Sequence, residues 1–348
     1  MNNRSDTIDI LRVLMAYIIV VYHSFLIGYN FIPGGGIATE FFFLVTGALM
    51  NRSLLKSKDI SLWSYIKHKF GKIIVMFWFT SAMTLGVIWV SNYQGIKKCM
   101  GDVITSIFEL LFLRMAGFAE QYYINPVAWY LSAIFLTTIL IYPLARRYRE
   151  ACSKWIFPLI TIGLCSFLIK EYGTVVTVST NYTYFSLDLV KRAIAEICLG
   201  FSLYEVAIYI SNQRWTRTGI TVLRLMEIMG YASIIIASLF GLDQGYSIWI
   251  LMLLSCSVAI SFSGYGVSLK LRENKVRYLL SEFSLSVYLS HYYIVVLMGK
   301  INAIINFKPL QFLVVYLVLV TLVSALNITI VKQLKSLGVA LRKVFICD

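Results

Sequence analysis

An arginine and a histidine stand eleven positions apart in the first long apolar stretch of the chain. Arg12 and His23 both fall within residues 8–27. Eleven residues make three turns of an α-helix, so both side chains would point to one stripe, about 16 Å apart along the axis. Asp9 precedes Arg12 by three positions and can pair with it on that stripe. Because ionisable groups inside an apolar helix are costly, this stripe predicts a functional site; the structural alternative is an inner-leaflet anchor beside an interhelical hydrogen-bonder.

Two later apolar stretches carry groups that could complete such a site. Glu40 opens the second stretch at the depth expected for His23, where a carboxylate would hold the tautomer of the imidazole and stabilise its cation. Ser286, Tyr288 and His291 lie in the ninth stretch and could form a polar wall opposite His23. The alternatives are an interfacial glutamate, and hydroxyl groups that join neighbouring helices.

Four charged residues cluster in the sixth apolar stretch. Asp188 and Arg192 form one i,i+4 pair, and Arg192 and Glu196 form a second. These pairs predict either a self-neutralised ladder at the outer edge of a membrane, or a place where Lys191 or Arg192 receives an anionic group of a substrate or cofactor.

The elements that must position these residues are long apolar helices. The composition is 59% hydrophobic and only 14% charged, whereas about a quarter of the residues of a soluble domain are charged. A helix that spans a bilayer needs about 20 mostly apolar residues, so we expect one all-α, polytopic membrane domain over residues 1–348. Ten stretches qualify as spans: 8–27, 37–55, 73–91, 127–145, 155–170, 189–210, 220–240, 246–266, 278–298 and 310–331.

The distribution of basic residues predicts how these helices are oriented. The formal net charge is +14, and most Lys and Arg residues fall in the alternate connections that face the cytoplasm if the N-terminus does. This bias favours ten spans with both termini in the cytoplasm, and it accounts for the charge without nucleic acid as a partner. The even count requires the shorter stretch 103–116, which contains Glu109 and Arg114, to be interfacial or re-entrant.

Two further features bear on partners. The connection 59–72 is basic with interleaved aromatic residues, which predicts an amphipathic helix lying on the inner leaflet and touching membrane lipids. The six cysteines show no spacing typical of a disulfide framework or a metal site. We therefore expect no metal.

Four short motifs lie on the predicted helices in a fixed order. The first is Asp9-Ile10-Leu11-Arg12 followed by His23, an R-x10-H arrangement. Residues 40–47 read EFFFLVTG, residues 129–131 read WYL, and residues 286–291 read SVYLSH. In this order they resemble the motifs of the acyltransferase-3 family of integral membrane O-acyltransferases, with a threonine where the second motif of that family usually has serine. The resemblance covers nearly the whole chain.

This resemblance implies transfer of an acyl group, usually acetyl from acetyl-CoA, to a hydroxyl of an extracytoplasmic polysaccharide or lipid-linked sugar of a bacterial cell. Acyl-CoA would be the donor, and no cofactor would be bound permanently. The phosphates of CoA would meet Arg12, Lys69 and Lys72, and Ser286 would also contact CoA. The arm of CoA would run outward along the stripe toward His23.

The resemblance also implies roles for the buried polar groups. His23 would act as general base on the acceptor hydroxyl or carry the acyl group transiently, and Glu40 would orient it. Tyr288, Ser286 or His291 would donate hydrogen bonds to the developing oxyanion. Substrate contacts are expected at three further positions: Lys191, Arg192 and Trp129.

Three rival interpretations stay open from the sequence. The same fold could use succinyl-CoA, with Lys191 and Arg192 binding the second carboxylate. A transporter or flippase is a different class of protein, but the sequence lacks two matching halves with Gly- or Pro-broken helices. A ligand-sensing membrane module is the third interpretation, and the sequence does not fix the oligomeric state.

Overall fold

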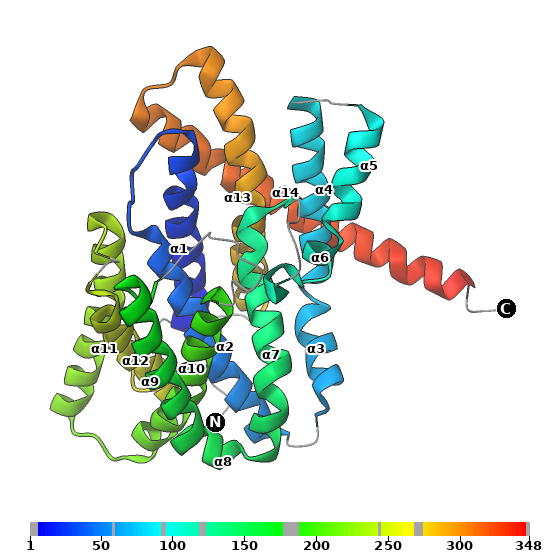
Figure 1. The fold of residues 1–348 in the computed structure, drawn as a ribbon. Helices are drawn as coiled ribbons and strands as arrows, with labels where there is room; N and C mark the ends of the chain where they lie inside the picture. The colour runs from blue at the N-terminus through cyan, green and yellow to red at the C-terminus, as the bar shows by residue number, and fades with distance from the viewer. Residues whose placement is uncertain are drawn as a thin grey trace.

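The computed structural model describes residues 6–57, 60–91, 95–117, 123–176, 188–242, 245–267 and 274–345. Within these ranges every regular element is a helix, and the long helices stand side by side in a bundle (Figure 1). The expected all-α membrane architecture is thereby confirmed.

Each of the ten predicted stretches forms a helix. They are α1 (Asp6–Tyr22), α2 (Ala38–Lys56), α4 (Ile74–Ser91), α7 (Trp129–Arg147), α9 (Phe157–Tyr172), α10 (Asp188–Asn212), α11 (Arg217–Phe240), α12 (Ser247–Ser263), α13 (Asn274–Ile305) and α14 (Pro309–Phe345). Eight helical segments of the described chain are long and apolar enough to cross a membrane. The other two helices are α12, with 17 residues, and α2, which carries charged residues in both its first and its last turn.

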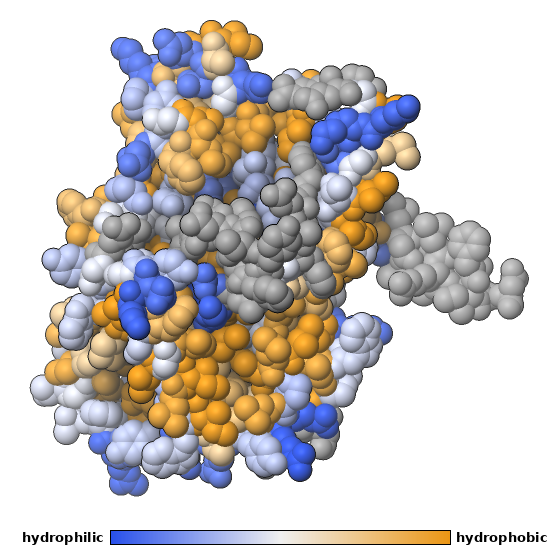
Figure 2. Space-filling view, in the orientation of Figure 1, coloured by the Kyte–Doolittle hydropathy of each residue, from blue (hydrophilic) through white to orange (hydrophobic). Residues whose placement is uncertain are grey.

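The surface of the bundle has the character of a membrane protein. Apolar side chains gather over α7 and α9, and hydrophilic side chains form a rim below them (Figure 2). Trp63, Trp155 and Trp249 are largely exposed, and tryptophan is enriched where a membrane meets water. The chain is therefore a multi-pass membrane protein.

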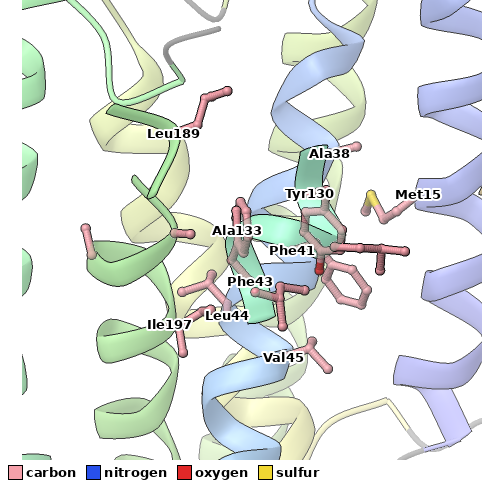
Figure 3. Close-up of a cluster of buried hydrophobic side chains, with 14 of the residues drawn as sticks. Met15, Ala38, Phe41, Phe43, Leu44, Val45, Tyr130, Ala133, Leu189 and Ile197 are labelled. Atoms are coloured by element: carbon pink, nitrogen blue, oxygen red, sulfur yellow. The ribbon is translucent and has the colours of Figure 1, made fainter. Parts of the chain in front are cut away.

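Helix α2 lies at the centre of the core, between α1 and α10. Met15 of α1 and Ile197 of α10 approach it from opposite sides, as Figure 3 shows. Gly47 and Gly200 let the backbones of α2 and α10 touch, because a Cβ added at either glycine would lie 2.0 Å from a carbonyl oxygen of the other helix. Small residues at a crossing allow this close packing in membranes.

The connections between the long helices contain short helical pieces. Between α1 and α2 these are η1 (His23–Ile27) and η2 (Gly35–Ile37), and between α2 and α4 there is α3 (Leu62–Phe70). Between α7 and α9 they are α8 (Arg149–Ala151) and η5 (Cys152–Ile156). Helix α3 buries Ile66 and Phe70 and exposes Lys67, as expected for the amphipathic helix predicted over 59–72.

The segment that precedes α7 is broken into four pieces. They are α5 (Ile96–Thr105), α6 (Ile107–Leu110), η3 (Arg114–Ala116) and η4 (Pro126–Ala128). None of the eight segments long and apolar enough to cross a membrane includes α5, α6 or η3 in the described chain. Trp78 of α4 donates its indole N–H to the carbonyl of Leu110 at 3.0 Å, and Ser132 of α7 donates to the carbonyl of Phe112 at 2.8 Å. These contacts fix the segment against the bundle.

Candidate functional site

His23 and His291 meet between α1 and α13. Helix α1 ends at Tyr22, and His23 is the first residue of η1. The sequence had predicted one continuous helix to residue 27. Nδ1 of His23 lies 3.3 Å from Nε2 of His291, and the two ring centroids are 4.8 Å apart. His291 is fully buried, whereas His23 is partly exposed. The contact confirms the prediction that His291 lies opposite His23, whereas the carboxylate predicted beside His23 is not its partner.

The backbone determines which ring nitrogens carry protons. Nδ1 of His23 lies 2.8 Å from the carbonyl oxygen of Ile19, and Nδ1 of His291 lies 2.6 Å from that of Tyr288. A carbonyl oxygen can only accept, so both Nδ1 atoms donate when the rings are neutral. Nε2 of His291 then accepts from His23, and Nε2 of His23 keeps a lone pair that no hydrogen bond within the described ranges uses. A neutral imidazole with an open Nε2 can act as a general base or as a nucleophile.

The three donors predicted to bind an oxyanion are all engaged. The hydroxyl of Tyr288 donates to the carbonyl of Val127, and that of Ser286 donates to the carbonyl of Ser324 at 2.9 Å. Nδ1 of His291 donates to the carbonyl of Tyr288, so all three side chains donate their hydrogen bonds to backbone carbonyls. In this conformation the three side chains join and orient helices, and none offers a free proton to an oxyanion. Ser286 in particular faces α14 and contacts neither histidine through a hydrogen bond of the described residues.

Glu40 lies in a separate buried cluster between α2 and α10. Its carboxylate is fully buried and has no hydrogen-bond partner among the described residues, and the charged groups that act on it are Glu196 and Arg192. Arg192 donates from Nε to Glu196 at 2.7 Å and from Nη2 to Thr39 at 2.7 Å. The predicted pair of Arg192 and Glu196 forms, and both side chains are in the protein interior. Asp188 pairs with Lys191 at 2.9 Å. No hydrogen bond of the described residues joins Glu40 to His23.

Two basic side chains meet near the start of α1. Nη1 of Arg12 lies 3.3 Å from Oδ1 of Asp9. Lys69 approaches from α3, and its Nζ is buried without a hydrogen-bond partner in the described part of the chain. Burial, and secondarily the charge of Arg12, lowers the pKa of Lys69 to about 7. Such a pair of cations, one of them unneutralised and shielded from water, is suited to an anionic group.

Tyr130 of α7 connects this basic end with the histidine end. Its hydroxyl is hydrogen-bonded to Thr46 and lies within electrostatic reach of Arg12 and Tyr288. Its ring centroid lies 4.6 Å from that of Phe43 and 5.8 Å from that of Tyr288. Polar and aromatic side chains therefore run from Arg12 to the turn that carries His291.

Two other predicted residues, Lys72 and Lys191, lie away from this path, and a third, Trp129, borders it. Lys72 is exposed, and its Nζ lies 3.2 Å from Nε2 of His68. Lys191 pairs with Asp188 at 2.9 Å. Trp129 packs on Phe43, with ring centroids 6.2 Å apart. No hydrogen bond or ring contact within the described ranges joins any of the three to His23 or His291. The same ranges contain no group of three or more His, Cys, Asp or Glu side chains that could hold a metal ion.

Sequence reasoning missed Asn125 and gave Glu109 and Arg114 no part in the site. All three are buried, and Asn125 donates from Nδ2 to the carbonyl of Leu289 at 3.1 Å, in the turn before the buried histidine. Burial raises the pKa of Glu109 to about 7, while Arg114 and two backbone N–H donors act in the opposite direction. The opposite charges of Glu109 and Arg114 in the short apolar stretch 103–116 could have indicated that these residues have partners inside the protein. Charged groups are tolerated in such a buried segment only when other protein groups satisfy them.

Comparison with known proteins identifies a family. Residues 5–328 match a family model, Acyl_transf_3, described as an acyltransferase domain. No curated protein and no solved structure matches the chain significantly. The matched range runs from the start of α1 into α14 and includes both histidines, Arg12 and Lys69.

Proposed function

The chain belongs to the acyltransferase-3 family, as its four motifs predicted, and we propose that it moves an acetyl group from acetyl-CoA to a hydroxyl of an extracytoplasmic polysaccharide or lipid-linked sugar. One observation carries the proposal: His23 presents an open Nε2 lone pair while Ile19 and His291 bind its other nitrogen. A hydroxyl is a weak nucleophile until its proton is removed, so a positioned imidazole supplies what the reaction needs.

The transfer then proceeds through one proton carrier. Nε2 of His23 removes the proton of the acceptor hydroxyl as the oxygen attacks the thioester carbonyl carbon. The C–O bond forms, the C–S bond breaks, and the departing CoA sulfur receives the proton from His23. The products are the acetyl ester and free CoA, and His23 returns to its neutral form. Transient acylation of the same Nε2 atom, followed by transfer to the hydroxyl, is the second role that an open imidazole nitrogen permits.

His291 stabilises the charged state of this cycle. When His23 holds the extra proton, its Nδ1–H faces the carbonyl oxygen of Ile19 and the unprotonated Nε2 of His291. Both acceptors carry partial negative charge and are fixed before the reaction, so they stabilise the imidazolium without reorganising. His291 is therefore a positioning residue, in the part that the sequence assigned to Glu40.

The donor enters at the basic end of the site. Arg12 and Lys69 would bind phosphates of CoA, and Lys72, which is exposed three residues beyond Lys69, would add a third positive charge. The pantetheine arm would follow the path along Tyr130 to the histidine pair. The predicted location is a bacterial cell membrane, with the N-terminus in the cytoplasm. This orientation puts Arg12 on the cytoplasmic side, where CoA is made, and His23 toward the opposite side.

The test is an activity comparison between two histidine variants. The wild type, His23→Gln and His68→Gln would be expressed in cells deleted for the gene, and alkali-labile acyl esters on surface polysaccharide would be measured by mass spectrometry. Purified protein in liposomes would be given acetyl-CoA or succinyl-CoA with the same polysaccharide. His68 is an exposed histidine on α3, so it controls for loss of an imidazole as such.

We expect ester formation to fall about 10²–10⁴-fold in His23→Gln, as is typical for removal of a general base, and to be unchanged in His68→Gln. The mass of the released acid identifies the acyl group, so succinate in place of acetate would revise the donor. Wild-type protein that forms no ester, or a His23→Gln variant as active as wild type at equal membrane levels, would overturn the proposed function.

A further inference from the structure

Glu109 binds the backbone that leads into η4. Its carboxylate oxygens accept the N–H groups of Ile124 and Asn125, each at 2.8 Å. Glu109, Ile124 and Asn125 are all buried. Two N–H donors bound by two oxygens of one carboxyl group fix both the position and the direction of this short segment, and in the ionised form of the group these bonds are about twice as strong as neutral ones.

The same segment is held from its other side by Arg114. Nη1 of Arg114 donates to the carbonyl of Pro126 at 2.5 Å and to that of Asn125 at 3.4 Å. Glu109 therefore binds N–H groups of the segment and Arg114 binds its carbonyls. The backbone of 124–127 is the ligand of both charged side chains, which explains how opposite charges are tolerated inside the bundle.

The segment then binds the turn of α13 that carries His291. Nδ2 of Asn125 donates to the carbonyl of Leu289 at 3.1 Å. The hydroxyl of Tyr288 donates back to the carbonyl of Val127. One of these hydrogen bonds is donated by the segment and the other by the turn. The segment and the turn therefore cannot shift relative to each other without breaking a hydrogen bond.

That turn positions the reactive pair. The carbonyl of Tyr288 accepts Nδ1 of His291 at 2.6 Å, and Nε2 of His291 lies 3.3 Å from Nδ1 of His23. We propose that Glu109 is a positioning residue of the acyl transfer reaction, which acts on His23 through segment 124–127, the α13 turn and His291. This inference rests on the proposed function, and it adds a residue that touches neither the reacting atoms nor the two histidines.

The side chain must be a carboxylate for this role. Glutamine at the same place has one acceptor oxygen and one NH₂ group, so one of the two backbone N–H groups would face another donor in a buried site. A buried donor without an acceptor is costly, and the segment would shift to relieve it. A small misplacement of a group that orients a catalytic residue can cost about 10²-fold in rate.

The experiment compares Glu109→Gln with Glu227→Gln in the liposome assay. Glu227 of α11 is a matched control, because it is equally buried, accepts the backbone N–H of Val267 at 2.5 Å and accepts a hydroxyl from Ser261. We expect kcat to fall about 10²-fold in Glu109→Gln with the KM for acetyl-CoA unchanged, and kcat to be retained in Glu227→Gln at matched thermal stability. Asn125→Ala keeps the carboxylate and removes one bond to the α13 turn, so its kcat should fall about tenfold.

Each outcome decides the inference. If Glu109→Gln unfolds, the kcat of Asn125→Ala decides it alone. A kcat near the wild-type value in the folded Glu109→Gln variant, or in Asn125→Ala, overturns the positioning role and leaves the proposed function intact. Equal losses in Glu109→Gln and Glu227→Gln also overturn it, because they indicate general destabilisation. A wild type without acyl transfer removes both the proposed function and this inference.

Discussion

Two buried polar regions of this molecule look alike in the sequence and differ in the structure. The histidine region joins His23 of η1 to His291 of α13, and the arginine region joins Arg192 and Glu196 of α10 to Glu40 of α2. The first has one open lone pair on a partly exposed ring. The second is sealed, with all three side chains at most 1% exposed. An ionisable residue inside a bundle therefore becomes a candidate for chemistry only when an unsatisfied atom can also be reached.

The difference arises from what surrounds each region. The arginine region lies where the backbones of α2 and α10 touch through Gly47 and Gly200. The histidine region lies where α1 ends and where segment 124–127, which leads into η4 and includes its start, contacts α13. Continuous helices in direct contact leave no path for a ligand, whereas helix ends and irregular segments can line one.

The largest effect expected from this comparison is on folding. In Arg192→Met the carboxylates of Glu40 and Glu196 would face each other without a cation. Breaking a buried ion pair from one side costs about 3–5 kcal/mol. We expect Arg192→Met to lower the yield of monodisperse protein and its unfolding temperature in detergent, as measured by fluorescence-detected size exclusion after heating.

Lys191→Met is the matched control for that change. Lys191 pairs with Asp188 near the surface, so its loss should cost about 0–1 kcal/mol. A folded, fully stable Arg192→Met variant with a raised KM for donor or acceptor would contradict the structural assignment and restore the substrate role that the sequence predicted for Arg192.

The next effect concerns the helix contact that seals the arginine region. A methyl group added at Gly47 would lie 2.0 Å from the carbonyl oxygen of Ile197, so α2 and α10 must separate to accept it. Overpacking of this kind typically costs about 1–3 kcal/mol. Gly47→Ala should therefore unfold at a lower temperature than wild type, measured in the same assay.

Gly86→Ala in α4 provides the comparison, because nothing lies within 4 Å of the position of its added Cβ. There alanine should be neutral or stabilising, since glycine is a weak helix former. If the two glycine variants were equally stable, the close contact of α2 and α10 would not be what seals the region.

The helices were predictable because hydropathy is a local property of the sequence. All ten apolar stretches became helices, and the shorter, charged stretch 103–116 is divided among α5, α6 and η3, none of which lies in a segment long and apolar enough to cross a membrane. Arg12 and His23 were identified from spacing within one helix. The change to η1 at His23 was missed, because no residue there marks the end of the α-helix.

The partners of these residues were harder to predict, because they depend on contacts between distant helices. His291 is 268 residues from His23; the sequence predicted it opposite His23 as one of three residues of a polar wall, but nothing in either stretch specifies that His291 is the one of the three that contacts the ring. Glu40 was assigned to His23 by depth alone, whereas the contact at Gly47 rotates α2 so that Glu40 lies near Arg192. Nothing in the sequence indicated Asn125, because its hydrogen bond to the α13 turn forms only after the segment that contains α6 has packed against the bundle.

The smallest expected effect is a pH dependence of CoA binding, which tests whether Lys69 at the basic end of the histidine region binds the phosphates of CoA. Lys69 has a pKa of about 7 in the free protein, lowered by burial and by Arg12. Bound phosphate favours the ammonium form, so CoA binding should be accompanied by proton uptake above pH 7. The Kd for CoA should rise as the pH is raised from about 7, by at most tenfold per pH unit. Isothermal titration calorimetry at pH 6, 8 and 9, in buffers of different ionisation enthalpy, measures both the Kd and the protons taken up.

Lys69→Arg sharpens this measurement, because arginine keeps its charge over the whole range. Its Kd should be nearly independent of pH between 6 and 9, and its proton uptake should vanish. A wild-type Kd that does not change with pH, or an equal slope in Lys69→Arg, would show that Lys69 does not bind the phosphates. The basic end would then depend on Arg12 alone, and the region would resemble the sealed arginine cluster more closely than its geometry indicates.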